Sequence, residues 1–473
     1  MKRTKIIATI GPATASREKI KQLIESGMNV ARINFSHGDH KSNGRLIDYV
    51  KELRQKLAVS VGIMADLQGP RIRTILVKDI KIKKGELIKI SDISHKTREA
   101  NCIILDWPGI IKDIEIGNNI LIEDGLLKIS VTEKNANYLV AKAETDGVVR
   151  NNKGINIPES RLKMESLTQK DEEDLKFILN KDVDFIALSF VSSAKDIINA
   201  REKIKKILGG ASGLPHIIAK IERKKAIKNI MEIIKAADAI MVARGDLGIE
   251  LDESRVVIYQ KEIIAQCLRA AKPVIVATQM LNSMIENPRP TRAEVSDVSN
   301  AVIDHTDCVM LSGETADGKY PIQSVKVMKD IIGKTEKSPF DILAHGFLGD
   351  RRSSISSAVA HSAHELLKDT NSEAIVAASV SGFTARMISR HRPEKTIYVV
   401  TNNEKTHNQL SLLWGVESFI LPDCQTLDEL IDKSIEILKR NKLVKTGDKI
   451  VVVAGRPHIV KEHMRLVKIE EVK

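Results

Sequence analysis

The sequence predicts an α/β protein in which a (β/α)8 barrel carries an inserted small β domain and is followed by an open-sheet α/β domain. Three observations lead to this fold class. Short apolar runs alternate eight times with amphipathic stretches of helical period, a stretch of short alternating strands interrupts them, and a second alternation of strands and helices fills the last part of the chain.

The eight apolar runs are expected to be parallel strands, because helical patterns follow most of them. The strands are residues 4–11, 28–36, 60–69, 183–191, 215–222, 239–246, 273–280 and 308–313. The helical patterns are residues 16–26, 43–57, 170–181, 194–208, 226–237, 256–271, 293–305 and 324–333. Eight such units close into a TIM barrel, whose functional residues lie at the carboxyl ends of the strands. Residues 1–69 and 160–337 are assigned to this barrel.

The barrel pattern is interrupted between about Gln68 and Lys163 by short strands without a convincing helix. Alternating strand patterns cover residues 86–91, 118–131 and 138–144, and turn signals lie at residues 84–85, 117–118 and 124–125. Residues 70–159 are therefore expected to form a small β-barrel, inserted after the third barrel strand. In that place the insertion can act as a lid over the mouth of the barrel.

A second α/β pattern begins after about Ser338. A helix is predicted at residues 356–369, and strands at residues 373–379, 395–401, 416–421 and 448–455. Residues 338–473 are thus expected to form a separate open-sheet α/β domain, whose size is usual for a domain.

The composition is that of an ordinary globular protein, with 42% apolar and 29% charged residues among 473. No apolar stretch approaches the ~20 residues that a membrane helix needs, and the N-terminus leads directly into a strand, so we expect a cytoplasmic protein without membrane contact. The four cysteines are widely spaced and give no sign of a zinc site. The net charge of +12 would suit nucleic acid, but aromatic residues make up only 3% and acids lie among the lysines, so no nucleic-acid partner is expected.

Polar residues stand where predicted strands end, often two positions apart. Glu222 follows Lys220 at the end of the fifth strand, and Asp246 follows Arg244 at the end of the sixth. Residues i and i+2 of a strand point to the same face, and adjacent strands lie ~4.8 Å apart, so these two carboxylates can reach one ion. Two carboxylates completed by water and substrate oxygens are typical of a magnesium site. The alternative is that both acids cap the helices that follow.

Lys220 lies one layer deeper than Glu222 on the same face of the strand. A fixed ammonium beside a metal-bound phosphate stabilises the charge on a phosphoryl group during transfer. The alternative is a lysine that only forms an ion pair with Glu222.

The second and third strands end in a further polar group. Arg32, Asn34 and Ser36 share one face at the end of the second strand, and Asp66 ends the adjacent third strand. A guanidinium binds phosphate or carboxylate through two hydrogen bonds, so Arg32 is a candidate anion ligand.

Arg71 and Arg73, again two positions apart, lie where the chain enters the inserted domain. Thr278 ends the seventh strand and Ser312 ends the eighth. A hydroxyl at either place could relay a proton through water, or it could simply satisfy nearby backbone groups.

The segment from Gly313 to Lys319 matches G-x-x-x-x-G-K, the phosphate loop of nucleotide hydrolases. Tyr320 and Pro321 come next, so the Ser or Thr that would hold magnesium is absent and the helix start is delayed. We therefore expect nucleotide to be bound elsewhere.

Taken together, these residues resemble the pyruvate kinase family. The matching segments are residues 5–14, 28–38, 69–74, 122–125, 152–158, 184–191, 217–222, 239–250, 272–281, 287–302 and 308–321. The combination of MVARGDLGIE, PRPTRAE and MLSGETA is highly specific. The resemblance covers nearly all of the barrel and parts of the inserted domain, and it is weaker over the final domain.

The resemblance implies transfer of the phosphoryl group of phosphoenolpyruvate to ADP, which gives ATP and an enol that is then protonated. It implies Mg2+ (or Mn2+) bound by Glu222 and Asp246. The implied catalytic residues are Lys220, Thr278, Arg32 and Arg73, and the implied substrate-binding residues are Arg32, Gly245, Asp246 and Thr278. The implied nucleotide-binding residues are Asn34, Phe35, Ser36, His37, Arg73 and Lys153. A homotetramer is also implied.

Three departures from the family pattern are visible. Many members have Gly-Pro-Glu where this chain has Gly69-Pro70-Arg71, and that glutamate helps to create a potassium site whose ligands match Asn34, Ser36 and Asp66. A fixed cation at Arg71 could replace the ion, so K+ is not expected to be required. Asp317 stands where some relatives have Lys, with no clear consequence.

The third departure lies in the final domain, which resembles the family's effector domain but lacks a Gly-Thr-Thr-Asn-like stretch near its end. The loop SVSGFTAR, residues 379–386, could place backbone amides at a helix N-terminus, which suits a phosphorylated effector or no ligand at all. Two other functions stay open on the residues alone. One is a metal-dependent aldolase or lyase acting on pyruvate or 2-oxo acids, and the other is a basic nucleic-acid-binding protein.

Overall fold

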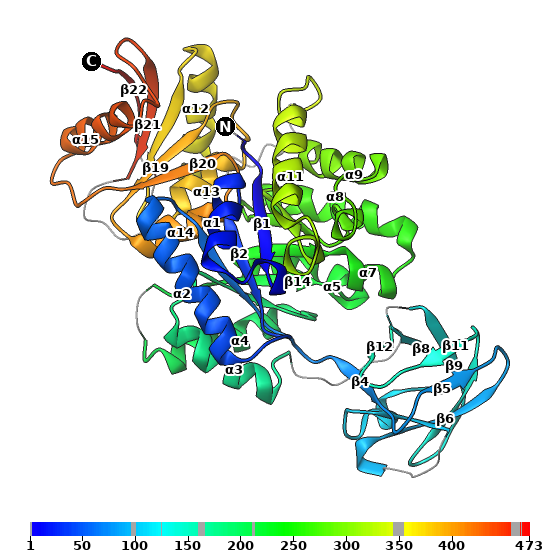
Figure 1. The fold of residues 1–473 in the computed structure, drawn as a ribbon. Coiled ribbons are helices and arrows are strands. Elements are labelled where there is room, and N and C mark those ends of the chain that lie inside the picture. Colours follow the sequence, from blue (N-terminus) through cyan, green and yellow to red (C-terminus); the bar gives the residue numbers. More distant parts are fainter. Residues whose placement is uncertain are drawn as a thin grey trace.

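The computed structural model describes residues 2–95, 101–123, 125–158, 166–210, 213–343, 354–455, 464 and 466–473. Three bodies are visible in Figure 1: a central barrel with its helices, a small β-barrel (cyan) that projects from one end, and an α/β domain (yellow to red) near the other end. The fold class expected from the sequence is confirmed.

Eight parallel strands form the central barrel, and β17 pairs with β1 to close it. The strands, in their order around the barrel, are β1 (Lys5–Ile10), β2 (Val30–Asn34), β3 (Gly62–Asp66), β13 (Phe185–Leu188), β14 (His216–Ile221), β15 (Ala239–Ala243), β16 (Val274–Ala277) and β17 (Cys308–Leu311). Apolar side chains of these strands are buried both inside the barrel and against the helices, which explains the continuous apolar runs in the sequence.

Helices surround this barrel and, in sequence, lie between its strands or directly after the last one. They are α1 (Arg17–Ser26), α2 (His40–Leu57), α3 (Gln169–Asn180), α4 (Ala194–Ile207), α5 (Lys224–Lys228), α6 (Ile230–Ala236), α7 (Arg244–Glu250), α8 (Glu253–Arg269), α9 (Arg292–Ile303), α10 (Gly313–Ala316) and α11 (Pro321–Thr335). Capping boxes fix the starts of α3 at Thr168 and of α9 at Thr291. Among the described residues, no helix has the length and apolar character that crossing a membrane requires.

The inserted domain is a closed barrel of seven strands with an accompanying two-stranded sheet of β5 and β11. The strands are β4 (Ile72–Ile75), β5 (Ile80–Ile82), β6 (Leu87–Asp92), β7 (Cys102–Leu105), β8 (Asn119–Ile122), β9 (Leu127–Lys134), β10 (Leu139–Ala143), β11 (Gly147–Val149) and β12 (Gly154–Asn156). Its core consists mainly of isoleucine and leucine side chains from alternating positions, the pattern that the sequence shows.

The final domain has a five-stranded sheet in the order β20-β19-β18-β21-β22. Its strands are β18 (Ala374–Ala378), β19 (Ile397–Thr401), β20 (Val416–Ile420), β21 (Lys449–Ala454) and β22 (Leu466–Glu471), and its helices are α12 (Ile355–Asp369), α13 (Phe383–Ser389), α14 (Glu404–Gln409) and α15 (Leu427–Arg440). The sequence reading missed β22, an antiparallel edge strand. Most of its residues are partly or fully exposed, so it lacks the apolar run that identifies the other strands. The stretch compared with the family's Gly-Thr-Thr-Asn segment falls largely outside the described residues.

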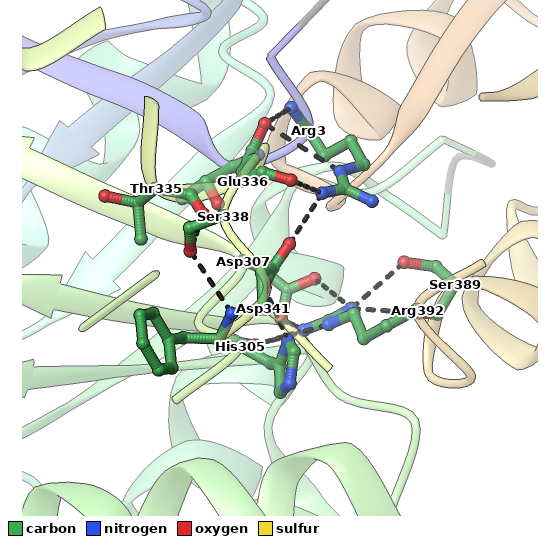
Figure 2. A network of polar contacts seen from close by, with 11 residues as sticks. Arg3, His305, Asp307, Thr335, Glu336, Ser338, Asp341, Ser389 and Arg392 are labelled. Carbon is green, nitrogen blue, oxygen red and sulfur yellow. Dashed lines mark hydrogen bonds and ion pairs between the residues drawn. The ribbon is translucent and has the colours of Figure 1, made fainter. Parts of the chain in front are cut away.

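The final domain covers the N-terminal ends of the barrel strands. Leu412 packs into the same buried cluster as barrel side chains such as Phe185. Figure 2 shows the polar part of this junction, where the Arg392 guanidinium lies 2.9 Å from the Asp307 carboxylate and donates to the carbonyl of His305. Since this end is closed, the open mouth of the barrel lies at the carboxyl ends of the strands, on the side of the small β-barrel (Figure 1).

Candidate active site

Lys220 stands at the centre of a buried ion cluster at the carboxyl end of the barrel. Its ammonium lies 2.9 Å from Glu222 Oε1 and 3.2 Å from Asp66 Oδ1, and it donates to the Ser189 hydroxyl at 2.7 Å. Lys220 and Glu222 come from β14 and the position just after it, as their spacing predicted. The cluster therefore joins the ends of three strands, β3, β13 and β14.

The cluster carries compensating charges in a dry environment. Burial alone would lower the pKa of Lys220, but the carboxylates of Asp66 and Glu222 outweigh it and raise that pKa above its usual value. Burial would likewise raise the pKa of Asp66, but Lys220 and Arg32 hold it below its usual value. The Lys220 side chain is therefore a permanent cation at neutral pH.

Arg32 extends the cluster toward β1. Its Nε donates to Asp66 Oδ2 at 2.7 Å, and its Nη1 donates to the Thr9 hydroxyl at 2.9 Å. Two strand neighbours thus fix the guanidinium, and its position beside Lys220 concentrates positive charge at the mouth of the barrel. Such a pair of cations can bind an anion.

Glu222 is 2% exposed, and both of its oxygens are oriented. Oε1 is close to the Lys220 ammonium, and Oε2 accepts a hydrogen bond of 2.6 Å from the backbone N–H of Phe190. Among the described residues, no three His, Cys, Asp or Glu side chains form a ready-made metal cage. Any ion here would need substrate or water ligands beside the two carboxylates.

The structure corrects the expected placement of Asp246 and Arg244. Strand β15 ends at Ala243, and both residues belong to the short helix α7. Residues two apart in a helix do not share a face. The buried Arg244 accordingly turns to Asp297 at 2.7 Å and to the carbonyl of Thr278, so it does not supply positive charge beside Asp246 in the manner of a strand pair.

Thr278 directly follows β16, the seventh barrel strand, and contacts the start of α7. Its backbone has a left-handed φ of 68°, which is uncommon for a β-branched residue. In this conformation the Thr278 hydroxyl accepts a hydrogen bond of 2.8 Å from the backbone N–H of Gly245. The contact places two predicted substrate-binding residues side by side.

The predicted nucleotide segment from Asn34 to His37 forms a turn after β2. Strand β2 ends at Asn34, so Ser36 lies in the turn. This corrects the prediction that Ser36 shares the strand face with Arg32 and Asn34. The Asn34 side chain caps the turn by accepting from the Ser36 N–H. Phe35 is buried, and its carbonyl accepts a hydrogen bond from Lys170 at 2.7 Å.

The remaining predicted residues belong to the small β-barrel and its entry. The Lys153 ammonium is 2.6 Å from Glu123, and the Arg73 guanidinium donates to the carbonyl of Asn152. The Arg71 guanidinium lies against β12, since a Cβ at Gly154 would be 2.9 Å from its Nε and Nη2.

The loop after β17 does not form a phosphate loop. The carboxylate of Glu314 is buried and accepts from the backbone N–H of Ser312 and of Leu281. Asp317 caps the short helix α10 through its own backbone N–H. Ser312 takes part in this contact through its backbone N–H, and its hydroxyl does not cap α10.

Sequence reasoning missed three residues of this centre, Thr9, Ser189 and Phe190. Each lies on or just after a predicted barrel strand, but none is charged, so each reads as part of an apolar run. Strand position was the available signal, since Ser189 directly follows β13 at the functional end of the barrel.

Comparisons with known proteins agree with this geometry. Residues 1–325 match the family model described as "Pyruvate kinase, barrel domain", and residues 357–470 match "Pyruvate kinase, alpha/beta domain". The chain belongs to the pyruvate kinase family. It is therefore a phosphotransferase, and membership favours phosphoryl transfer over an aldolase, a lyase or a nucleic-acid-binding protein.

Similarity to individual members of the pyruvate kinase family is extensive. The pyruvate kinase of Geobacillus stearothermophilus is 42% identical over 464 residues, which is 96% of this chain and 78% of the relative. That of Lactobacillus delbrueckii subsp. bulgaricus is 39% identical, covering 97% of this chain and 78% of the relative. The crystal structure of a pyruvate kinase from Cryptosporidium parvum superposes with a TM-score of 0.94 at 36% identity, and the match covers 100% of this chain and 96% of that one.

Proposed function

We propose that this protein transfers the phosphoryl group of phosphoenolpyruvate to ADP, giving pyruvate and ATP, in the last step of glycolysis. The observation that carries the proposal is the buried Lys220 ammonium, held by Asp66, Glu222 and Ser189 at the mouth of a pyruvate kinase barrel. A preorganised cation of this kind stabilises charge on a phosphoryl group without reorganisation during transfer.

In this proposal Arg32 binds the transferring phosphate beside Lys220. Their positions on adjacent sides of Asp66 support the assignment. Gly245 and Thr278 bind the rest of phosphoenolpyruvate, and their mutual hydrogen bond supports a common role. The Thr278 hydroxyl lies at the same mouth, where it can pass a proton to the enol through water.

Glu222 and Asp246 are the proposed ligands of Mg2+ or Mn2+. Their hard carboxylate oxygens fit such an ion. Both carboxylates oppose burial in raising the pKa of Lys220, and both add to burial in raising the pKa of Glu250, which supports their closeness. When bound, the ion neutralises charge on the phosphate and enolate oxygens. Asp246 projects from α7, so the helix and not a strand end would present it.

Asn34, Phe35, Ser36, His37, Arg73 and Lys153 are the proposed nucleotide-binding residues. Arg73 and Lys153 reside on the small β-barrel, so we propose that this body acts as a lid that brings them to the phosphates of ADP. Lys153 would exchange its contact with Glu123 for a phosphate, and because both side chains are partly exposed, loss of that contact costs little free energy.

A requirement for K+ is not part of the proposal. The Asp66 carboxylate, one of the expected potassium ligands, is already neutralised by Arg32 and Lys220. Arg71 supplies a further fixed cation at the entry to the lid. Both features reduce the negative potential that would attract a monovalent ion.

A coupled assay tests the proposal. Pyruvate is expected from phosphoenolpyruvate only when ADP and a divalent ion are present. Lys220→Met and Glu222→Ala are both expected to lose activity, whereas nucleotide-independent formation of pyruvate by the parent protein would contradict the proposal.

The expected homotetramer and cytoplasmic location are part of the same proposal, as is a phosphorylated effector bound by the loop at residues 379–386. Light scattering tests the subunit count. A sugar phosphate and a nucleotide, added in turn to the saturation assay with phosphoenolpyruvate, test the effector. Unchanged curves with both compounds would leave the final domain without a regulatory role.

A further inference from the structure

The dipeptide Ser189–Phe190, directly after β13, contacts Lys220 of β14 and Glu222, which directly follows that strand. The Ser189 hydroxyl is buried, accepts from the Lys220 ammonium at 2.7 Å and donates to the carbonyl of Leu67 at 2.8 Å. The Phe190 backbone N–H donates to Glu222 Oε2 at 2.6 Å. One short segment thus determines where the ammonium and the carboxylate lie.

Phe190 adopts a backbone conformation that a residue with a bulky side chain disfavours. Its φ is 57°, in the left-handed region, where a bulky L-residue is strained. Such a conformation persists only where the surroundings enforce it, and strained residues of this kind cluster at functional sites. In this conformation the Phe190 N–H points toward Glu222.

Two contacts enforce this conformation. The Arg223 guanidinium lies over the Phe190 ring, 5.0 Å from its centroid. The ring also packs closely on Gly69, where a Cβ would come within 3.1 Å of Phe190 Cδ2 and within 2.8 Å of Ser189 Cβ. Gly69 has a φ of 69° and leads into the small β-barrel, so the lid connection touches the same segment.

We propose that Ser189–Phe190 is a positioning element, in which Ser189 orients the Lys220 ammonium and Phe190, clamped by Arg223, orients the Glu222 carboxylate toward the divalent ion. This inference rests on the proposed function. Because Glu222 Oε2 is held by Phe190, the direction of the carboxylate is set before an ion arrives. Partners that orient a metal ligand typically change metal affinity by about 10–100-fold.

The first experiment measures Mn2+ binding to the substrate-free enzyme by electron paramagnetic resonance. Arg223→Gln and Phe190→Leu are expected to weaken Mn2+ binding about 10-fold, and Arg223→Lys, which keeps a cation over the ring, is expected to retain most of the affinity. The matched control is Arg17→Gln, which removes a guanidinium 5.6 Å from the Tyr49 ring on the outer helices. Melting temperatures confirm that each variant is folded.

The outcomes separate the inference from the proposed function. If Glu222→Gln weakens Mn2+ binding but Arg223→Gln and Phe190→Leu bind within twofold of the parent, the positioning role is wrong and the metal assignment stands. If Glu222→Gln itself binds Mn2+ as the parent does, the metal assignment fails, and the inference fails with it.

The second experiment separates the two halves of the element. Ser189→Ala is expected to lower kcat about 10-fold through the misplaced ammonium, with Mn2+ affinity unchanged, and Ser189→Thr is expected to restore kcat. A purely structural role would lower both quantities together or neither. Equal kcat values for Ser189→Ala and the parent would overturn this half of the proposal.

Discussion

The Lys220 ammonium lies 2.9 Å from the Glu222 carboxylate, with one residue between them in the chain. Glu222 is buried and the Lys220 side chain is only 12% exposed, and the second carboxylate partner of Lys220 is Asp66. Each charge is therefore balanced before substrate arrives. In the proposed reaction Glu222 would share its charge between Lys220 and the divalent ion, which leaves the ammonium better able to attract the phosphoryl group.

Lys220→Met is expected to lower kcat by a factor of about 10²–10³. Removal of one preorganised group of this kind raises the activation free energy by about 2.7–4 kcal/mol. Steady-state kinetics with phosphoenolpyruvate and ADP measure the loss. Lys224→Met is the matched control, because Lys224 is exposed on α5 and is expected to leave kcat unchanged. A kcat for Lys220→Met within threefold of the parent would contradict the assigned role.

Much of this centre follows from the sequence because strands obey a simple rule. Lys220 and Glu222 were predicted to share a face, and they form an ion pair across it. Arg32 and Asp66, at the ends of adjacent strands, also meet. The same rule failed at Arg244 and Asp246, because the chain leaves β15 at Ala243 and turns at once into α7.

The features that the sequence did not reveal depend on backbone geometry or on distant partners. Phe190 reads as one more apolar residue of a strand, and its left-handed φ has no signature in an aromatic side chain. Strand β22 was missed because an exposed edge strand lacks an apolar run. The turn of Ser36 out of β2 depends on the Asn34 side chain, which forms a local cap that periodicity does not describe.

Arg392→Ala is expected to destabilise the junction between the barrel and the final domain. Its guanidinium is buried and pairs with Asp307 (Figure 2). The Asp307 carboxylate also accepts from the Trp414 N–H. Loss of one partner leaves a buried charge unpaired, which typically costs about 3–5 kcal/mol. Urea unfolding followed by tryptophan emission measures the change.

Lys395→Ala is the control for that experiment. Lys395 forms an exposed pair with Glu373 at 2.8 Å in the same domain. Exposed pairs contribute at most about 1 kcal/mol. Equal shifts of the urea midpoint for the two variants would show that burial of Arg392 has no special effect.

Activity is expected to be independent of K+. In a buffer whose only monovalent cation is tetramethylammonium, the rate is expected to stay within twofold of the rate with K+. Arg71→Glu is expected to create a K+ requirement, because a carboxylate there would add the missing negative charge. Arg150→Glu, on the exposed surface of the small β-barrel, is the control. A large loss of parent activity without K+, restored by K+, would contradict this prediction.

Asp341 is expected to make stability depend on pH between about 4 and 6. Burial, with the nearby carboxylate of Glu336, outweighs Arg3 and raises the pKa of Asp341 to about 6, whereas an unfolded chain has an Asp pKa of about 3.9. The folded state therefore binds more protons in this window, and the free energy of unfolding falls as pH rises through it. A difference of about two pKa units corresponds to on the order of 3 kcal/mol.

Asp341→Asn isolates this effect, because an amide resembles the protonated acid at every pH. The parent and the variant are expected to have similar free energies of unfolding near pH 4. As the pH approaches 6, the variant is expected to become more stable than the parent, by an amount reduced by the loss of the ion pair with Arg3. His305 lies 3.4 Å from Asp341, and burial lowers its pKa to about 4. Its stabilising effect is lost as pH falls, the opposite direction, so it does not imitate the Asp341 signal. Parallel curves of unfolding free energy against pH for the two proteins would refute the prediction.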